Sequence, residues 1–249
     1  MKNKNENMNS IHFTLQGKGG VGKSLVSALL AQYYTDKGAD VKSIDTDPVN
    51  QTLVNYKALK AQHIELLDGS KINERNFDKL MERLLSEDGV FIVDNGASSF
   101  VPLSNYLIEN DAIKMLKDSG RNVFIHSVIT GSQALLDTLS GFNALASHAT
   151  DKNIVVWLNQ YFGAIESDGK TFLDMKAYKD NQDKVCGIVE IAKRNQDTFG
   201  KDVEQMVTSK LTFSEAIKSP EFSLMAKQRI KTVQADIYNQ LEAIGALNG

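Results

Sequence analysis

One short segment decides the fold of this chain: Gly17-Lys18-Gly19-Gly20-Val21-Gly22-Lys23-Ser24. It agrees with the pattern G-x-x-x-x-G-K-[ST] at every fixed position, which is typical of a phosphate-binding loop between a strand and a helix. Glycines let backbone N–H groups surround phosphate oxygens closely, and the N-terminus of the following helix adds a positive field. The segment therefore predicts a site for ATP with Mg²⁺.

Each residue of the loop has an expected role. Lys23 would reach the β- and γ-phosphates, and the Ser24 hydroxyl would ligate Mg²⁺. A glycine-rich turn that binds nothing would leave this Lys-Ser pair unexplained. The remaining phosphate contacts are expected from the backbone of Gly17, Gly19, Gly20, Val21 and Gly22.

On both sides of the loop, short apolar runs alternate with segments of helical spacing. Strands are expected at Ile11–Gln16, Val41–Asp45, Ile64–Leu67, Val90–Val93, Val123–Ile129, Ile154–Leu158 and Cys186–Ile191. Helices are expected at Ser24–Lys37, Phe77–Leu85, Pro102–Leu116, Ser132–Ser147, Leu173–Asn181 and from Asp197 onward, with a long helix after Pro220. Continuous apolar strands separated by helices predict an α/β fold, a doubly wound and mostly parallel sheet with helices on both faces.

The composition narrows the class of protein. The chain has 249 residues, 42% of them hydrophobic and 24% charged, with a net charge of −3. This balance predicts a globular protein and argues against a general electrostatic nucleic-acid binder. Only three prolines occur and no linker interrupts the chain, so one P-loop ATPase domain is expected over residues 11–249. Residues 1–10 are polar and rich in asparagine, and a flexible N-terminal tail is expected there.

The single cysteine, Cys186, cannot form an internal disulfide or a metal cage. A reducing, cytoplasmic setting therefore fits best. The sequence also contains no apolar run of the length that a membrane-spanning helix needs.

Carboxylates follow two of the predicted strands. Asp45 and Asp47 lie at and just beyond the end of one, and Asp94 follows Val90–Val93. Ligands of open α/β sheets bind at the carboxyl ends of strands, so these positions suit Mg–ATP. An apolar strand that ends in Asp is typical of the Walker B position, where the carboxylate accepts a hydrogen bond from Mg²⁺-bound water. For Asp45 and Asp47 a plain turn remains the alternative, because Asp-Pro favours turns.

Lys18 is not required by the general motif. A second cation beside the loop is useful if it neutralises charge that develops on the γ-phosphoryl group, as a finger supplied in trans does, an effect worth about 10³–10⁵ in rate. The alternative is a solvated surface lysine.

Lys18 through Ser24 resembles the deviant Walker A segment of the MinD/ParA ATPases, P-loop NTPases of the SIMIBI type. In that family two monomers sandwich two ATP molecules, and the signature lysine crosses to the partner's phosphates. The resemblance implies this role for Lys18, activation of the attacking water for Asp47 and a place in the Mg²⁺ shell for Asp45. By analogy with related folds, Asn159 would contact the adenine, with a plain strand-end turn as the alternative. One departure is Asp94-Asn95-Gly96-Ala97, which stands where most members have Asp-Thr-Pro-Pro.

Within this family the chain resembles the conjugal-transfer TraL-like proteins. The likeness rests on Val93–Phe100, Gly131–Thr138 and Val156–Gly163. It implies a role in plasmid conjugation or maintenance, with slow turnover in the absence of a partner. Other branches fit less well: an iron–sulfur member needs more than one cysteine, and ten polar residues cannot make an N-terminal DNA-binding domain. Members that ride the bilayer end in a basic helix, whereas Leu241–Gly249 contains no base, so membrane attachment is not expected.

The leading expectation is thus an ATP-hydrolysing switch that forms an ATP-dependent homodimer. Its protein partner is unknown, with conjugation machinery and non-specific DNA left open. The alternative is an ATP-dependent ligase or kinase for a small molecule, similar to dethiobiotin synthetase-like enzymes. Such an enzyme needs a substrate pocket, which the sequence does not mark. The four histidines are scattered and form no evident cluster: His12, His63, His126 and His148. The apolar stripe of the last helix is expected to pack in the core: Ile230, Val233, Ile237, Leu241 and Ile244.

Overall fold

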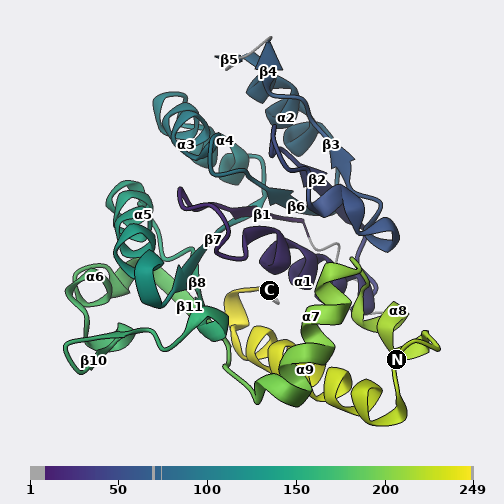
Figure 1. Ribbon diagram of the computed structural model, residues 1–249. Coiled ribbons are helices and arrows are strands. Elements are labelled where there is room, and N and C mark those ends of the chain that lie inside the picture. The colour runs from purple at the N-terminus through teal and green to yellow at the C-terminus, as the bar shows by residue number, and fades with distance from the viewer. Residues whose placement is uncertain (1–8, 69–70, 74, 248–249) are drawn as a thin grey trace, which may run out of the picture.

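A seven-stranded sheet forms the centre of the molecule (Figure 1) in the computed structural model, which describes residues 9–68, 71–73 and 75–247. The strand order is β11-β8-β7-β1-β6-β2-β3, and all neighbouring pairs are parallel. The strands are β1 (Ser10–Thr14), β2 (Val41–Asp45), β3 (Gln62–His63), β6 (Val90–Asp94), β7 (Asn122–Thr130), β8 (Ile154–Asn159) and β11 (Val185–Ile191). Two small antiparallel pairs lie outside it, β4 (Leu67–Asp68) with β5 (Lys71–Ile72) and β9 (Glu166–Ser167) with β10 (Lys170–Thr171).

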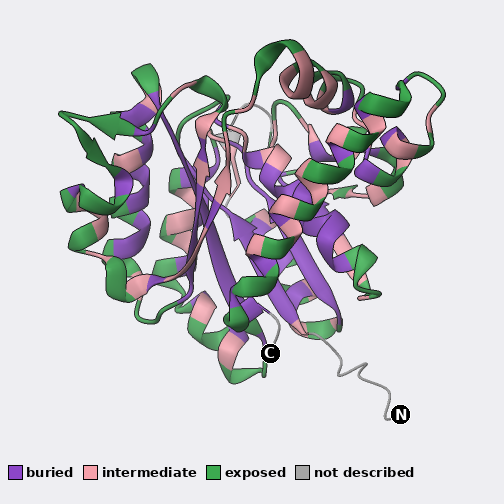
Figure 2. Ribbon diagram, turned by 90° about the horizontal axis from the view of Figure 1, so that it is seen from below, coloured by how far each residue is buried: buried purple, intermediate pink, exposed green. Residues whose placement is uncertain are grey.

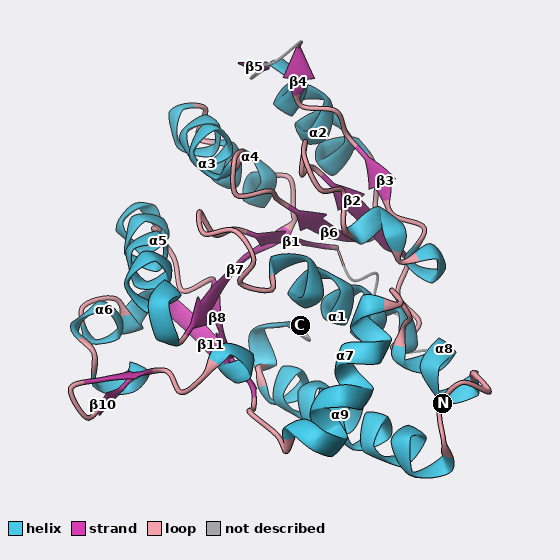
Figure 3. Ribbon diagram, in the orientation of Figure 1, coloured by secondary structure: helices cyan, strands magenta, loops and turns pink. Residues whose placement is uncertain are grey.

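Helices cover both faces of this sheet (Figure 3), as predicted. One face carries α1 (Lys23–Asp36), α7 (Lys201–Thr208), α8 (Phe213–Lys218) and α9 (Leu224–Ala243). The other carries α2 (Arg75–Ser86), α3 (Phe100–Glu109), α4 (Ala112–Asp118), α5 (Leu135–His148) and α6 (Lys176–Lys179). Strand side chains alternate between the two cores: Phe91 and Val93 pack on the α2–α5 side, whereas Val90 and Ile92 pack on the α1 side. The neighbouring strands β1 and β6 are consequently buried from end to end, whereas β2 and β11 are partly exposed (Figure 2).

Several expected elements differ in detail. The helix predicted over Pro102–Leu116 is two helices, α3 and α4, because Asp111 adopts a left-handed backbone conformation with φ of 49°. Of the strand predicted at Ile64–Leu67, only Leu67 lies in a strand. The apolar stripe of the last helix packs against the core as expected, with Ile230, Ile237, Leu241 and Ile244 buried. No helix in the described part of the chain is long and apolar enough to cross a bilayer.

Most of the predicted N-terminal tail, residues 1–8, lies outside the described residues. Its last two residues belong to the folded part of the chain. Ser10 begins β1, and the Asn9 carbonyl oxygen Oδ1 accepts a hydrogen bond from the Gly89 amide at 2.9 Å. The first strand thus starts one residue before the predicted position.

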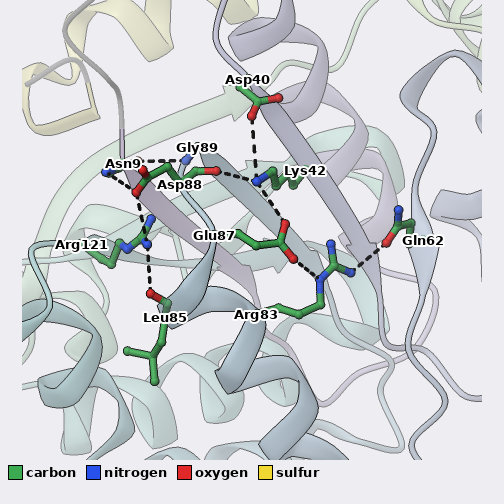
Figure 4. Close-up of polar contacts among 10 residues, drawn as sticks. All are labelled: Asn9, Asp40, Lys42, Gln62, Arg83, Leu85, Glu87, Asp88, Gly89 and Arg121. Atoms are coloured by element: carbon green, nitrogen blue, oxygen red, sulfur yellow. Dashed lines mark hydrogen bonds and ion pairs between the residues drawn. The ribbon is translucent and has the colours of Figure 1, made fainter.

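Charged side chains close the amino end of the sheet (Figure 4). Lys42 lies 3.0 Å from Glu87, which also accepts a hydrogen bond from Arg83 at 2.9 Å. Arg83 and Lys42 together lower the pKa of Glu87. The buried Arg121 donates to the Leu85 carbonyl at 3.2 Å. These contacts bind β2, β7 and α2 to one another at the end of the sheet that faces away from the phosphate loop.

Two of the histidines form a buried cluster, so the expectation that the four lie apart is wrong for this pair. His12 Nδ1 lies 2.9 Å from His126 Nε2, because β1 and β7 are neighbours in the sheet. The Trp157 indole lies 2.9 Å from His126 Nδ1, and Ser10 Oγ lies 3.0 Å from His12 Nε2. An indole only donates, so His126 carries its proton on Nε2 and donates to His12, which donates to Ser10. Burial lowers the pKa of both rings, that of His126 to about 3.

Candidate nucleotide-binding site

The phosphate loop joins the end of β1 to the start of α1 and takes its shape from glycines. Gly20 and Gly22 have φ of 74° and 103°, a region that other residues rarely adopt. A Cβ at Gly22 would also lie 2.8 Å from the Asn159 amide nitrogen. Helix α1 begins directly after Gly22, with no side chain capping its first N–H groups. The loop thus presents free backbone donors at a helix N-terminus, the arrangement that binds phosphate.

Lys23 lies inside this loop. Its ammonium donates to the Lys18 carbonyl at 2.8 Å, and the side chain is buried. Burial lowers the pKa of Lys23, while the negative charges of Asp94 and Asp47 act in the opposite direction. The cation is thus held across the loop, and its contact with phosphate remains a prediction.

Lys18 points elsewhere. Its ammonium lies 2.7 Å from the Asp137 carboxylate on α5, and the two side chains are 43% and 57% exposed. The two lysines of the motif therefore have different surroundings, one inside the loop and one on the accessible surface beside it. Asp137 was not among the predicted site residues, although it lies within the segment Gly131–Thr138.

Asp94 ends β6 next to α1. Its Oδ1 accepts a hydrogen bond from the Ser27 hydroxyl at 3.0 Å, whereas its buried Oδ2 has no hydrogen-bond partner among the described residues. Burial raises the pKa of Asp94 to about 7, against the opposing effect of the Ser24 and Ser27 hydroxyls and of Lys23. A buried carboxylate oxygen without a partner, close to a serine hydroxyl, fits a hydrated cation.

The described residues contain no group of three or more His, Cys, Asp or Glu side chains that could cage a metal. Mg²⁺ does not need such a group, because it keeps several waters and takes further ligands from phosphate. Ser24 and Asp94 are the residues that would hold the ion, and it would supply charge neutralisation at the phosphates.

Asp45 is fully buried and organises the loop after β2. Its Oδ1 accepts from the Asp47 amide at 3.0 Å, and its Oδ2 accepts from the amides of Leu53 and Val54 at 2.9 and 3.3 Å. Burial raises the pKa of Asp45, and these backbone hydrogen bonds partly offset the rise. The carboxylate therefore fixes the segment that carries Asp47, and its predicted place in the Mg²⁺ shell remains a prediction.

Asp47 lies where the loops after β2 and β6 meet. Its Oδ1 accepts hydrogen bonds from the amides of Val49 and Asn50 at 2.9 and 3.2 Å. A Cβ at Gly96 would lie 2.7 Å from the Asp47 carboxyl carbon, so glycine is needed there. A second link joins the same loops, because the Thr46 hydroxyl donates to the Asp94 carbonyl at 2.9 Å. The loops after β2 and β6 are consequently in direct contact.

Gln16, which was not predicted as a site residue, supports the start of the phosphate loop. Its fully buried amide accepts from the Gly17 N–H at 2.9 Å and donates to the carbonyls of Val128 and Thr138, both at 3.0 Å. Gly141 on α5 leaves the room for this amide, since a Cβ there would lie 2.0 Å from Gln16 Oε1. The only feature of the sequence that could have identified Gln16 as a supporting residue is its polar side chain directly before the motif.

Ser27 was also not predicted as a site residue. Its spacing of three residues from Ser24 on one helix is the feature that could have identified it.

Asn159 ends β8 and contacts the loop directly. Its Nδ2 donates to the Val21 carbonyl at 2.9 Å, and its Oδ1 accepts from the Tyr161 amide at 3.1 Å. The side chain is buried and both of its polar atoms have partners. It therefore supports the phosphate loop, and the predicted adenine contact remains untested by this geometry.

Comparison with known proteins gives the family of this chain and the folds that it resembles. The family described as the CobQ/CobB/MinD/ParA nucleotide binding domain matches residues 13–244. The chain is 47% identical to Protein TraL of Escherichia coli over 241 residues, which are 96% of this chain and 100% of the relative. A putative plasmid partition protein of Borrelia burgdorferi, solved with AMPPNP, has a similar fold with a TM-score of 0.54 at 15% identity, covering 97% of this chain and 100% of that one. MinD of Pyrococcus horikoshii, solved with Mg-ADP, gives 0.51 at 15% identity and covers 95% and 98%.

Proposed function

Because this chain belongs to the CobQ/CobB/MinD/ParA family of nucleotide-binding domains, we propose that it is an ATP-dependent molecular switch. ATP with Mg²⁺ would join two copies face to face, and slow hydrolysis to ADP and phosphate would release them. Backbone groups of residues 17–22 would hold the phosphates together with Lys23, while Ser24, Asp45 and Asp94 would organise the ion. Asp47 would orient the attacking water, and Asn159 would contact the adenine.

The placement of Lys18 carries the proposal. A lysine that served its own phosphates would be redundant beside Lys23, which already spans the loop. Lys18 instead extends to Asp137 on the surface, where a second copy can reach it. The exposed ion pair is weak enough to be exchanged for a partner's phosphates, since such pairs contribute about 0–1 kcal/mol.

Exposed apolar side chains near the phosphate loop are further evidence that another protein binds this surface. They lie in segments that follow the carboxyl ends of β2, β6, β7 and β8, the edge of the sheet from which the phosphate loop also leaves β1. Exposed apolar surface gathered at one edge is typical of a surface that another protein covers. Five large side chains there are between 46% and 75% exposed: Val49, Val101, Leu136, Tyr161 and Phe162.

The extensive identity to a TraL protein supports a plasmid-related role. We place the switch in conjugation or plasmid maintenance, where the ATP-bound dimer would hold a component of the transfer machinery or non-specific DNA. Alternation between the two nucleotide states would then position that partner.

Gel filtration and phosphate release test the proposal. The wild-type chain should elute as a dimer with ATP and Mg²⁺ and as a monomer with ADP. Lys18→Gln should still bind nucleotide but lose the ATP-dependent dimer, whereas Lys231→Gln, an exposed lysine on α9, should behave as wild type. Normal hydrolysis by a monomeric Lys18→Gln protein would refute the shared site. Transfer of the phosphoryl group to a metabolite instead of water would favour the ligase or kinase alternative.

A further inference from the structure

A second cavity, separate from the phosphate loop, opens between α3–α4 and α5. In Figure 1 α3, α4 and α5 all lie on the same face of the sheet. The cavity has a volume of about 470 Å³ and is lined by residues of these three helices. Leu15 and Ile125 form its floor, and Phe100, Leu107 and Leu145 form its walls. All five of these side chains are buried. The volume is within the range of about 300–1,000 Å³ that small-molecule sites occupy.

Two polar side chains that line this cavity each carry a buried oxygen without a hydrogen-bond partner among the described residues. Asn153 is only 7% exposed, and its Nδ2 donates to the Val123 carbonyl at 3.1 Å, which fixes the orientation of the amide. Its Oδ1 is buried and accepts nothing from the described residues, and the buried Ser104 hydroxyl is likewise unpartnered. An unsatisfied buried polar group costs about 1–3 kcal/mol. A ligand that donates a hydrogen bond here would relieve part of that cost.

The charges at the rim are nearly balanced. Lys114 and Lys117 face Asp111, Asp118 and Asp151, and Lys117 is already paired with Asp151. This rim therefore does not favour an ion of either sign. The interior is apolar, so that a ligand gains free energy chiefly by burying apolar surface.

We propose that this cavity binds a small, uncharged, mostly apolar molecule that carries a hydrogen-bond donor. Both acceptor atoms are covered in the ligand-free chain, so the Asn153 or Ser104 side chain turns toward the cavity to accept the donor. The apolar body contacts Phe100, Leu107 and Leu145. The site does not depend on the proposed ATP switch, because none of these contacts involves nucleotide.

The cavity is also connected to the phosphate loop. The Phe100 ring lies 3.0 Å from the position of a Cβ on Gly17, and the same side chain lines the cavity. Leu15, in its floor, is two residues before Gly17. A ligand that shifts the Phe100 ring thus changes the affinity for nucleotide, and by linkage nucleotide changes the affinity for the ligand equally. This coupling does rest on nucleotide binding at the loop.

Fluorescence titration with N-phenyl-1-naphthylamine tests the site, since this probe is neutral, apolar and carries one N–H donor. The nucleotide-free wild-type chain should give saturable enhancement with one site per chain. Ala144→Trp, which fills the cavity from α5, and Ile108→Trp, which fills it from α3, should each weaken binding at least tenfold. Ala243→Trp, an exposed alanine at the end of α9 on the opposite face, should leave it unchanged. Far-ultraviolet circular dichroism confirms that each variant is folded.

A competing probe tests the donor. In 1-benzylnaphthalene a CH₂ group replaces the N–H, so it should displace the first probe with about five- to tenfold lower affinity, as the loss of one hydrogen bond predicts. Absence of saturable binding to the wild type, or binding that survives both folded tryptophan variants, would overturn the site. Equal affinity of the two probes would overturn the role of the donor. A probe affinity that does not change between ATP with Mg²⁺ and no nucleotide would overturn only the coupling.

Discussion

The ammonium of Lys18 lies 2.7 Å from the carboxylate of Asp137, an ion pair between the phosphate loop and α5 of the same chain. In the proposed dimer Lys18 has to leave this partner and reach the phosphates of the second copy. Asp137 therefore competes with dimerisation, and the strength of the competition is limited by the exposure of both groups.

Asp137→Asn should tighten the ATP-dependent dimer. Removing the negative charge frees Lys18, and an exposed pair of about 0–1 kcal/mol corresponds to at most about a fivefold lower dissociation constant. Sedimentation with ATP and Mg²⁺ measures the constant. Asp183→Asn, an exposed aspartate between α6 and β11, is the matched control. A weaker dimer in Asp137→Asn would mean that Asp137 assists the dimer instead of opposing it.

Asp47→Asn should give a dimer that forms with ATP and stalls. The amide keeps the acceptor for the Val49 and Asn50 N–H groups but cannot accept a proton. Loss of a general base reduces rates by about 10²–10⁴, which a phosphate-release assay at saturating ATP detects. Asp47→Ala should dimerise and stall as well, with a looser loop after β2. Release at the wild-type rate by Asp47→Asn would exclude Asp47 as the base.

Gln16→Leu should destabilise the fold by about 1–3 kcal/mol, because it removes three hydrogen bonds and leaves the buried Val128 carbonyl without this donor. Nucleotide affinity should fall as well, since the start of the loop is no longer held. Urea unfolding measures the free energy of unfolding, and a nucleotide titration measures the affinity for nucleotide. The exposed Gln182→Leu should change stability by less than about 0.5 kcal/mol. Wild-type stability of Gln16→Leu would contradict the bracing role of this amide.

Stability should fall below about pH 6.5 because of the buried His12–His126 pair. The folded state lowers both pKa values, so between the folded and unfolded pKa the unfolded chain binds more protons. The contribution is complete above about pH 6.5 and is lost as the pH falls, by about 1.4 kcal/mol per pH unit for each histidine. Urea unfolding at pH 7.5, 6.0 and 5.0 measures the slope. His126→Gln should reduce it and the exposed His148→Gln should not; equal slopes in all three proteins would contradict the mechanism.

Local patterns in the sequence predicted the elements around the site well. The run Val90–Val93 identifies β6 because both faces of that strand are buried, and the glycine-rich motif marks the junction of β1 with α1. These features depend on neighbouring residues, which a sequence displays directly. The break at Asp111 depends on one left-handed residue and was missed, although Asn110-Asp111 is a pair that tolerates such a conformation.

Contacts between distant segments could not be predicted in the same way. His12 contacts His126 only because β7 lies beside β1. The sequence pattern of a single strand does not predict which strands will be its neighbours in the sheet. Likewise Lys18 meets Asp137 because α5 follows the strand adjacent to the loop. The residues of the candidate site could thus be predicted where they belong to a motif, and could not be predicted where the strand order brings them to it.

Gly96 bears on how the chain can be re-engineered. Asp47 occupies the space that any larger side chain at this position would need. A chimera that received Asp-Thr-Pro-Pro in place of residues 94–97 would put a proline ring into the carboxyl group of Asp47. The loops after β2 and β6 therefore depend on each other's side chains. A chimera that takes one of these loops from another family member has to take the other loop as well.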